Sequence, residues 1–263
     1  MRAIVAEMPL FTASVLANEE IARDYFRMDF SWPHDVRSPA PGEFVTVRVA
    51  DTSAPLLRRP FGVSAFSEGR CSMIYWRRGP GTRLLAGYEP GDALNVMAPL
   101  GHGFPAPAGD AVPVLAAGGV GIGPLLFFAN ALAAEGRSPV LLVGARTGAG
   151  QPRVQVDPAV QIRRATDDGT HGFHGTVIEL LERTIATTSG GAELYLCGPN
   201  PMLRAGHDVA GRLGLPAWVS MEQTMGCAVG ACMGCAVRVH GPERYARVCT
   251  EGPVFRSTEI VWE

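Results

Sequence analysis

The sequence predicts a multidomain fold in which an antiparallel β-barrel precedes an α/β domain with a doubly wound parallel sheet, and a small C-terminal domain follows. Three observations predict this fold. The first part of the chain has short segments of alternating apolar and polar residues between Gly- and Pro-rich turns, and the middle part has apolar runs that alternate with helical patterns. The third observation is a group of four cysteines near the end. We expect the domains at residues 1–104, 105–215 and 216–263.

Length and charge restrict the possible functions. A chain of 263 residues can form two ordinary domains and a small appendage. The net charge of −2 argues against a nucleic-acid partner, which normally requires a basic face. No apolar run approaches the ~18 residues of a membrane span, and Glu7, Pro9 and Asn18 interrupt any signal-type core. We therefore expect a cytoplasmic protein with no membrane association.

Short strands are expected throughout the first domain. The clearest is the β-branched run at residues 43–50, which follows a Pro-Gly turn. Further strands are expected at residues 61–66, 71–78 and 93–101 and within residues 11–32. Several short strands at near-regular spacing, with little helix between them, predict an antiparallel barrel.

Two segments of this barrel carry chemistry that suits a phosphorylated ligand. Arg58 and Arg59 precede Pro60 and Phe61, and a guanidinium there can pair with a phosphate. A Gly-Pro-Gly-Thr turn at residues 79–82 opens a short helix, where backbone amides can hold a pyrophosphate. A solvated strand edge and an ordinary turn explain the same residues, so neither segment alone assigns a ligand.

From residue 112 the pattern becomes that of a parallel sheet. The apolar run at residues 112–117 ends in a glycine-rich turn at residues 118–123, and Pro124 begins a helix that ends at Gly136. The alternation continues with strands at residues 139–144 and 194–198 and a helix at residues 176–184. Strands that alternate with helices predict a doubly wound sheet.

Two turns of this sheet lie where nucleotides bind, beyond the carboxyl ends of the strands. In the turn at residues 118–123, Pro124 occupies the place of the third glycine of the G-x-G-x-x-G fingerprint, so a tight strand-to-helix turn is the alternative to a nucleotide site. The turn at residues 196–202 contains Cys197, which a buried structural cysteine would also explain.

Four cysteines near the C-terminus have the spacing of a plant-type iron–sulfur site. Segments of four, two and thirteen residues separate Cys227, Cys232, Cys235 and Cys249. Structural zinc is the alternative, although its four-thiolate sites usually consist of two Cys-x-x-Cys pairs. Disulfides are disfavoured in a chain that has no secretory signal. We expect a [2Fe-2S] cluster. The cysteines outside this set are Cys71 and Cys197.

Taken together, these motifs resemble the ferredoxin-NADP reductase family, in which a flavin-binding barrel precedes a nicotinamide-binding α/β domain. The cysteine pattern and the segment that closes around Cys249 narrow the resemblance to the electron-transfer subunits of NAD-dependent, B-type dihydroorotate dehydrogenase. The match covers nearly the whole chain and includes residues 165–181.

The resemblance implies three cofactors, namely FAD, a [2Fe-2S] cluster and NAD, and it implies their binding residues. Those for FAD are Arg59, Pro60, Phe61, Gly62, Ile74, Tyr75, Trp76, Gly81 and Thr82. Those for the nicotinamide nucleotide are Gly118, Gly119, Gly121, Gly123, Cys197, Gly198 and Pro199. The cluster ligands are Cys227, Cys232, Cys235 and Cys249.

The chain departs from the family pattern at one position. Gly62 stands where the family often has Ser, so a hydroxyl hydrogen bond to the flavin ring is missing or is replaced by a backbone amide. Ser64 lies two positions further, on the same strand face. Arg146 and Arg153 follow the strand at residues 139–144, where an arginine can accommodate a 2′-phosphate, so the preference for NAD over NADP rests on the resemblance.

The function implied by the resemblance is that of an NAD-linked oxidoreductase subunit. It would pass electrons from an FMN-containing dihydroorotate dehydrogenase catalytic subunit, its partner in a heterotetramer of pyrimidine biosynthesis, through the cluster and FAD to NAD+. We expect no catalytic acid or base in this chain, and we expect the apolar loop at residues 225–237 to contact the partner.

Other functions stay open at this point. The first is another FAD/[2Fe-2S] NAD(P)H reductase that serves a hydrogenase or an oxygenase. The second is a zinc-bound regulatory or binding module, and the third is a free diaphorase without a partner.

Overall fold

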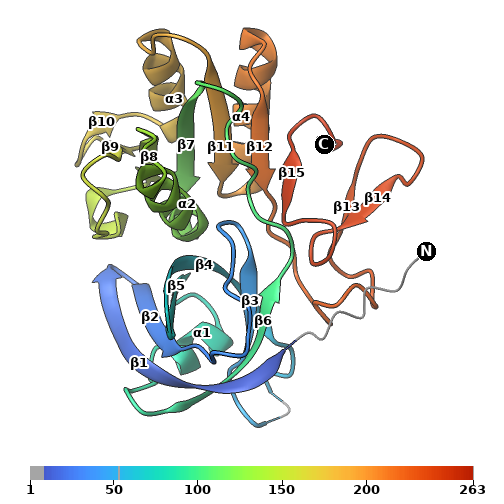
Figure 1. Ribbon diagram of the computed structural model, residues 1–263. Coiled ribbons are helices and arrows are strands. Elements are labelled where there is room, and N and C mark those ends of the chain that lie inside the picture. The colour runs from blue at the N-terminus through green and yellow to red at the C-terminus, as the bar shows by residue number, and fades with distance from the viewer. Residues whose placement is uncertain (1–8, 53, 263) are drawn as a thin grey trace.

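The computed structural model describes residues 9–52 and 54–262 and confirms the predicted three-part architecture. The barrel lies at the bottom of Figure 1, the α/β domain lies above it, and the C-terminal cysteine segment lies beside both. No helix in the described ranges is long and apolar enough to cross a membrane.

Six antiparallel strands close the barrel in the order β1-β2-β5-β4-β3-β6. Their bounds are β1 Leu10–Ala22, β2 Tyr25–Ser31, β3 Phe44–Arg48, β4 Arg59–Ser67, β5 Arg70–Trp76 and β6 Ala93–Leu100. The predicted short helix is α1, Pro80–Leu85, and it begins in the Gly-Pro-Gly-Thr turn. Apolar side chains that alternate along these strands fill the interior, among them Val45, Val47 and Met73.

Seven strands form the sheet of the second domain in the order β10-β9-β8-β7-β11-β12-β15. Only the β12–β15 pair is antiparallel. The strands are β7 Val112–Gly118, β8 Val140–Ala145, β9 Gln161–Thr166, β10 Phe173–His174, β11 Ala192–Cys197, β12 Ala217–Ser220 and β15 Val254–Arg256. The helical segments are η1 Gly119–Gly121, α2 Ile122–Ala134, η2 Gly148–Gly150, α3 Val177–Ala186 and α4 Asn200–Leu213.

Helices cover both faces of this sheet, as the doubly wound prediction requires. Alternate residues of β7 point to opposite faces, so Val114 belongs to the apolar cluster shared with α3 and α4, whereas Leu115 belongs to the cluster shared with α2. Helix α2 therefore lies between the sheet and the barrel. A β-carbon placed on Gly62 of β4 would lie 2.4 Å from a side-chain carbon of Pro124, which shows how closely α2 approaches the barrel.

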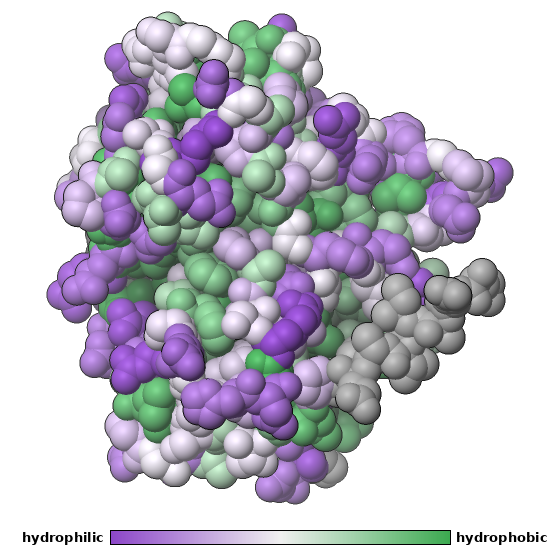
Figure 2. Space-filling model, in the orientation of Figure 1, coloured by the Kyte–Doolittle hydropathy of each residue, from purple (hydrophilic) through white to green (hydrophobic). Residues whose placement is uncertain are grey.

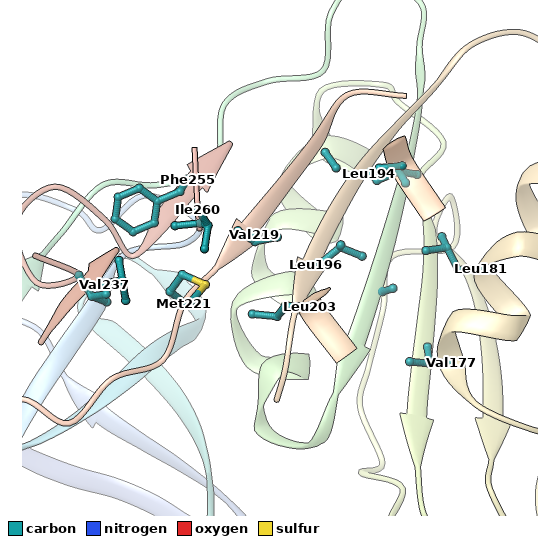
Figure 3. Packing of buried hydrophobic residues seen from close by; sticks show 14 of the residues in the cluster. Val177, Leu181, Leu194, Leu196, Leu203, Val219, Met221, Val237, Phe255 and Ile260 are labelled. Carbon is teal, nitrogen blue, oxygen red and sulfur yellow. The ribbon is translucent and has the colours of Figure 1, made fainter. Parts of the chain in front are cut away.

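The C-terminal segment shares its core with the sheet. Its own hairpin consists of β13, Ala236–Arg238, and β14, Tyr245–Arg247. Figure 3 shows Val237, Phe255 and Ile260 of this segment in the same apolar cluster as Val219 and Leu196 of the sheet. Since β12 and β15 are strands of the sheet, the sheet extends past the domain boundary predicted at residue 216. Strands of four and three residues are too short to show a periodic pattern in the sequence.

Candidate functional site

The four cysteines of the C-terminal spacing lie together as two pairs. The thiols of Cys227 and Cys232 lie within hydrogen-bonding reach of each other. Those of Cys235 and Cys249 do as well. The two pairs are connected, because Gly230, in the loop between the first two cysteines, donates its amide to the Cys249 sulfur at 3.2 Å. The structure thus brings all four predicted ligands into one site.

Backbone amides of the loop point at the sulfur atoms. The amides of Val229 and Cys232 donate to the Cys227 sulfur at 3.5 and 3.4 Å. Burial raises the pKa of Cys227, but these amides and the Cys232 thiol outweigh it and lower that pKa to about 7. Amide donors stabilise the thiolate, which is the form that binds metal. The loop therefore favours metal binding at Cys227.

The pairing of the thiols fits a two-iron cluster. A [2Fe-2S] cluster is held by four thiolates, so two pairs supply two sulfurs to each iron. One zinc ion would need all four sulfurs at about 2.3 Å from a single point. The Cys227–Cys232 and Cys235–Cys249 pairs therefore fit a [2Fe-2S] cluster.

Arg247 connects the cysteine loop to the segment that carries the fourth cysteine. Its Nη1 donates to the Gly230 carbonyl oxygen at 2.8 Å, and its Nε donates to Glu251 at 2.9 Å. A β-carbon on Gly230, whose φ is +78°, would lie 2.9 Å from a Thr250 methyl carbon. The glycine is thus required by both its conformation and its neighbour. The sequence gives no sign of this role of Arg247, because no local pattern relates the side chain to a carbonyl 17 residues away.

The predicted flavin residues of β4 lie half-buried on the barrel, beside the turn that begins α1. The Arg59 side chain lies across Gly81, where a β-carbon would be 2.7 Å from its Nε. The Thr82 hydroxyl is used within its own turn, since it accepts from the amides of Arg78 and Gly79 at 3.0 and 3.1 Å. A guanidinium beside a glycine turn, with the half-buried Phe61 ring on the same strand, fits a phosphorylated planar ligand such as FAD.

The three predicted flavin residues of strand β5 point to opposite faces of the strand. Tyr75 points into the barrel, where its hydroxyl donates to Asn18 at 2.8 Å and its ring stacks on Phe26. Ile74 packs in the apolar cluster of α2, and Trp76 stacks on Tyr25 with ring centroids 6.0 Å apart. Ile74 and Trp76 therefore face the second domain, and Tyr75 supports the barrel interior.

The two glycine turns predicted for the nicotinamide nucleotide pack directly against each other. They follow the neighbouring strands β7 and β11, in which Ala117 pairs with Cys197. A β-carbon on Gly121 would lie 2.1 Å from the Cys197 carbonyl oxygen, and one on Gly118 would lie 2.5 Å from the Met202 sulfur. Only glycine permits this approach. The result is a cradle of two tight turns at the carboxyl edge of the sheet, mostly buried but accessible at Gly119, Val120 and Pro199, and this edge is where a dinucleotide binds in such folds.

The barrel reaches this cradle through Tyr25, which the sequence analysis did not select. Its hydroxyl oxygen lies 3.5 Å from a β-carbon built on Gly119. Burial raises the pKa of Tyr25, and the nearby guanidinium of Arg146 lowers it in part. Figure 2 shows hydrophobic residues in the hollow between the two domains on this side of the molecule. No sequence signal relates Tyr25 to the turn, because the contact joins different domains.

The sequence also drew attention to Cys197 and Ser64. Cys197 is buried, and burial raises the pKa of its thiol to about 12, although a hydrogen bond with Ser220 acts in the opposite direction and lowers it. Ser64 is buried against Gly123, its β-carbon 3.5 Å from the position of a β-carbon there. Its hydroxyl has no hydrogen-bond partner among the described residues. Gly62 meets Pro124 and Ser64 meets Gly123, so both residues face α2, on one side of β4, as the two-residue spacing predicts.

Comparisons with known proteins agree with this geometry. Residues 222–261 match the family model of the iron–sulfur cluster binding domain of dihydroorotate dehydrogenase B. The chain is 40% identical to the dihydroorotate dehydrogenase B (NAD(+)) electron transfer subunit of Desulforamulus reducens, over 97% of this chain and 99% of that protein. It is 43% identical to the subunit of the same name from Bacillus caldolyticus, over 84% and 86%.

Solved structures show the same fold. An NADH-dependent reduced ferredoxin-NADP oxidoreductase, described in connection with flavin-based electron bifurcation, superposes with a TM-score of 0.83 at 26% identity, over 95% of this chain and 90% of that chain. Phthalate dioxygenase reductase superposes with a TM-score of 0.63 at 21% identity, over 89% and 88%. The second likeness concerns the fold alone.

Proposed function

This chain belongs to the family of electron transfer subunits of dihydroorotate dehydrogenase B, and on that premise we propose that it passes electrons from an FMN-containing catalytic subunit to NAD+. The observation that carries the proposal is the arrangement of the four cysteines as two thiol pairs. The segment that contains them packs in the same apolar core as the sheet of the second domain. That sheet in turn contacts the barrel through α2. One compact molecule thus contains an iron–sulfur site, a flavin site and a nicotinamide site.

The roles of the residues follow from what each cofactor can do. An iron–sulfur cluster passes single electrons and FAD exchanges them for the hydride of a nicotinamide, so this chain needs to position its cofactors and supplies no acid or base. Cys227 and Cys232 would hold one iron of the cluster, and Cys235 and Cys249 would hold the other. Arg59 and the turn at Gly81 bind the FAD phosphates.

The glycine turns bind the nucleotide. The cradle formed by Gly118–Gly123 and Cys197–Pro199 would meet the nucleotide through its accessible part, the half-buried Gly119 and Val120 and the exposed Pro199. Tyr25 and Trp76 extend from the barrel towards that cradle. A nicotinamide held there would lie beside the barrel strand that carries Gly62, where the usual hydroxyl hydrogen bond to the flavin is missing or is replaced by one from a backbone amide.

The catalytic subunit docks over the cysteine loop. Met233 is 51% exposed between Cys232 and Cys235, and Tyr245 of β14 is 53% exposed. Large apolar side chains exposed beside a redox centre suit a protein interface. The barrel of this chain is filled by its own side chains, so the oxidation of dihydroorotate takes place in the partner. Free thiols as metal ligands also suit a reducing compartment, and we propose a cytoplasmic location.

The test is to prepare the chain anaerobically, alone and together with its catalytic subunit. We expect iron and acid-labile sulfide in the isolated chain, a flavin spectrum that NADH bleaches, and reduction of NAD+ by dihydroorotate only when the catalytic subunit is present. Oxidation of dihydroorotate by the isolated chain, or a flavin that NADH does not bleach, would contradict the proposal.

A further inference from the structure

A close contact joins the barrel to the cysteine segment where the chain leaves β6. The amide of His102 donates to the Gly252 carbonyl oxygen at 2.7 Å. A β-carbon on Gly101, whose φ is +77°, would lie 2.8 Å from the same carbonyl oxygen and 2.6 Å from a ring carbon of Pro253. In Figure 1 the chain after β6 passes beside the C-terminal segment on its way to β7. Only glycine permits so close an approach.

The fourth predicted cluster ligand lies one turn away from this contact. The amides of Glu251 and Gly252 donate to the Arg247 carbonyl oxygen at 2.8 and 3.3 Å, so the chain between Cys249 and Gly252 is a tight turn. Cys249 is itself buried and pairs with Cys235. The contact therefore connects the barrel, through a single turn of backbone, to a thiol of the iron–sulfur site.

Phe44 of β3 extends from the barrel into the apolar core that contains these cysteines. The Phe44 ring belongs to the same cluster of buried side chains as Cys235 and Cys249, whereas the next residue, Val45, fills the barrel interior. The Cε1 atom of the ring lies 2.9 Å from the position of a β-carbon on Gly101. The ring therefore packs directly against the contact between the barrel and the cysteine segment.

Phe44 also lies beside the strand that is expected to meet the flavin ring. It pairs with Gly62 across the antiparallel strands β3 and β4, a pairing that places two α-carbons about 4.5–5.5 Å apart. The amide of Val63 donates to the Glu43 carbonyl oxygen at 3.1 Å and holds the two strands together at this point. Phe44 thus lies between Gly62 and the cysteine segment. That Gly62 meets the flavin rests on the proposed function.

We propose that Phe44 and the contact of Gly101 with Gly252 form the route by which single electrons pass between the cluster and the flavin. The rate of electron tunnelling falls steeply with distance and with every unfilled gap, and here packed atoms fill the space between the two sites. Phe44 fills that space and Gly101 sets the distance, so both are positioning residues, and neither is itself oxidised or reduced.

The electrons balance over two passages along this route. Each passage takes one electron from the reduced cluster to FAD, and the catalytic subunit then reduces the cluster again. Two passages, together with one proton from water, give the reduced FAD that returns two electrons and the proton to NAD+ as a hydride. The route therefore carries every electron that the chain delivers to NAD+.

The test follows the route in reverse, in the full chain loaded with FAD and its cluster. Stoichiometric NADH delivers two electrons to FAD, and one of them then passes to the cluster, so stopped-flow absorbance records the bleaching of the flavin and then that of the cluster. In Gly101→Ala the new methyl group pushes the Gly252 carbonyl away. We expect the cluster to bleach about 10–100-fold more slowly, as displacements of about 1 Å can cause at reacting centres, while the flavin bleaches at the wild-type rate.

Gly69→Ala is the matched control. Gly69 lies between β4 and β5 of the same barrel with a φ of +76°, close to that of Gly101, and a β-carbon there meets no atom within 4 Å. The substitution therefore adds the same backbone strain without disturbing the contact, and both bleaching rates should stay those of the wild type. Hydrogen exchange of the His102 amide is a readout that does not depend on electron flow, and it should speed up in Gly101→Ala alone.

Phe44→Leu tests the ring and keeps the inference falsifiable if Gly101→Ala does not fold. The smaller side chain leaves part of the space empty and adds no backbone strain. Bleaching of the cluster should slow severalfold, and the midpoint potentials of flavin and cluster should stay unchanged, because the substitution alters no ligand and no charge.

The rates and the potentials together separate the outcomes. If hydrogen exchange shows that Gly101→Ala opens the contact and the cluster still bleaches at the wild-type rate, the route is wrong and the proposed function stands. A wild-type rate in Phe44→Leu removes Phe44 from the route. Slower bleaching that comes with a shifted potential also overturns the inference, since the driving force and not the distance has then changed. If NADH bleaches neither flavin nor cluster in the wild-type chain, the proposed function itself fails.

Discussion

The glycine turn at residues 118–123 and the cysteine loop at residues 226–235 are both glycine-rich, but different forces hold their shapes. In the turn, glycine is required by neighbouring protein: the Cys197 carbonyl oxygen would lie 2.1 Å from a β-carbon on Gly121. In the loop, a β-carbon on Gly226 or Gly234 would first meet the Cys232 sulfur, at 3.2 and 3.4 Å.

The difference shows two ways of building a redox site. The turn is shaped by the close packing of two strands and their helices, so it is complete without its nucleotide. The loop is held by hydrogen bonds to sulfur and by Arg247, and its thiols lie half-buried or exposed at Cys227 and Cys232. We therefore expect the loop to depend on its metal for stability, and the turn to depend on its packing.

The largest effect is expected from Cys235→Ser, which removes one sulfur from a buried pair. A serine hydroxyl does not replace a thiolate ligand, so the variant should lose most of its iron and sulfide while it keeps its FAD. Iron analysis and the visible spectrum measure this. Cys71→Ala, in the barrel core, is the control and should keep its iron. Full iron content in Cys235→Ser would remove Cys235 from the ligand set.

Gly121→Ala should damage the turn and leave the loop intact. The added methyl meets the Cys197 carbonyl oxygen, so β7 and β11 must move apart, at a cost of about 1–3 kcal/mol in the free energy of unfolding. We expect slow bleaching of the flavin by NADH and unchanged iron content. Denaturant unfolding and stopped-flow absorbance check the two parts. Wild-type bleaching together with wild-type stability would mean that the two turns do not pack as described.

Arg247→Gln tests the connection within the loop. Loss of the guanidinium removes the hydrogen bond to the Gly230 carbonyl and frees the amide that donates to Cys249. Outer contacts of this kind typically change metal affinity by about 10–100-fold, so iron should be lost faster to a chelator and the electron paramagnetic resonance signal of the reduced cluster should shift. Arg247→Lys keeps the charge but not the forked geometry and should show an intermediate effect. Chelation at the wild-type rate in both variants would leave Arg247 without a role in the loop.

The smallest effect is expected from Gly211→Ala, in which the new methyl group meets no atom within 4 Å. Position 211 lies inside the exposed end of α4, so the substitution should stabilise the fold by about 0.5–1 kcal/mol through helix propensity. Thermal unfolding measures it. This variant is also the matched control for Gly121→Ala, because it makes the same chemical change where packing is open. A loss of stability here would show that glycine is required for more than close approach.

Elements with strong local signals were predicted nearly to the residue. The helix expected from Pro124 to Gly136 is α2, Ile122–Ala134, because proline and glycine mark its ends. The helix expected at residues 176–184 is α3, which Thr176 and Glu179 begin with a capping box. Strand β9 was not predicted, since its sequence QIRRAT has no apolar run or alternation. It is a strand because β8 supplies its hydrogen-bond partners.

By itself, the sequence determined the chemistry of this protein: which thiols are available, at which spacing, and which turns lack side chains. Those features are local, so composition and spacing suffice to predict them. Only the tertiary structure decided how they are combined, through the pairing of Cys235 with Cys249, the contact of Gly121 with Cys197, and the approach of Tyr25 to Gly119. Such contacts join residues far apart in the chain, and the packing of whole layers sets them.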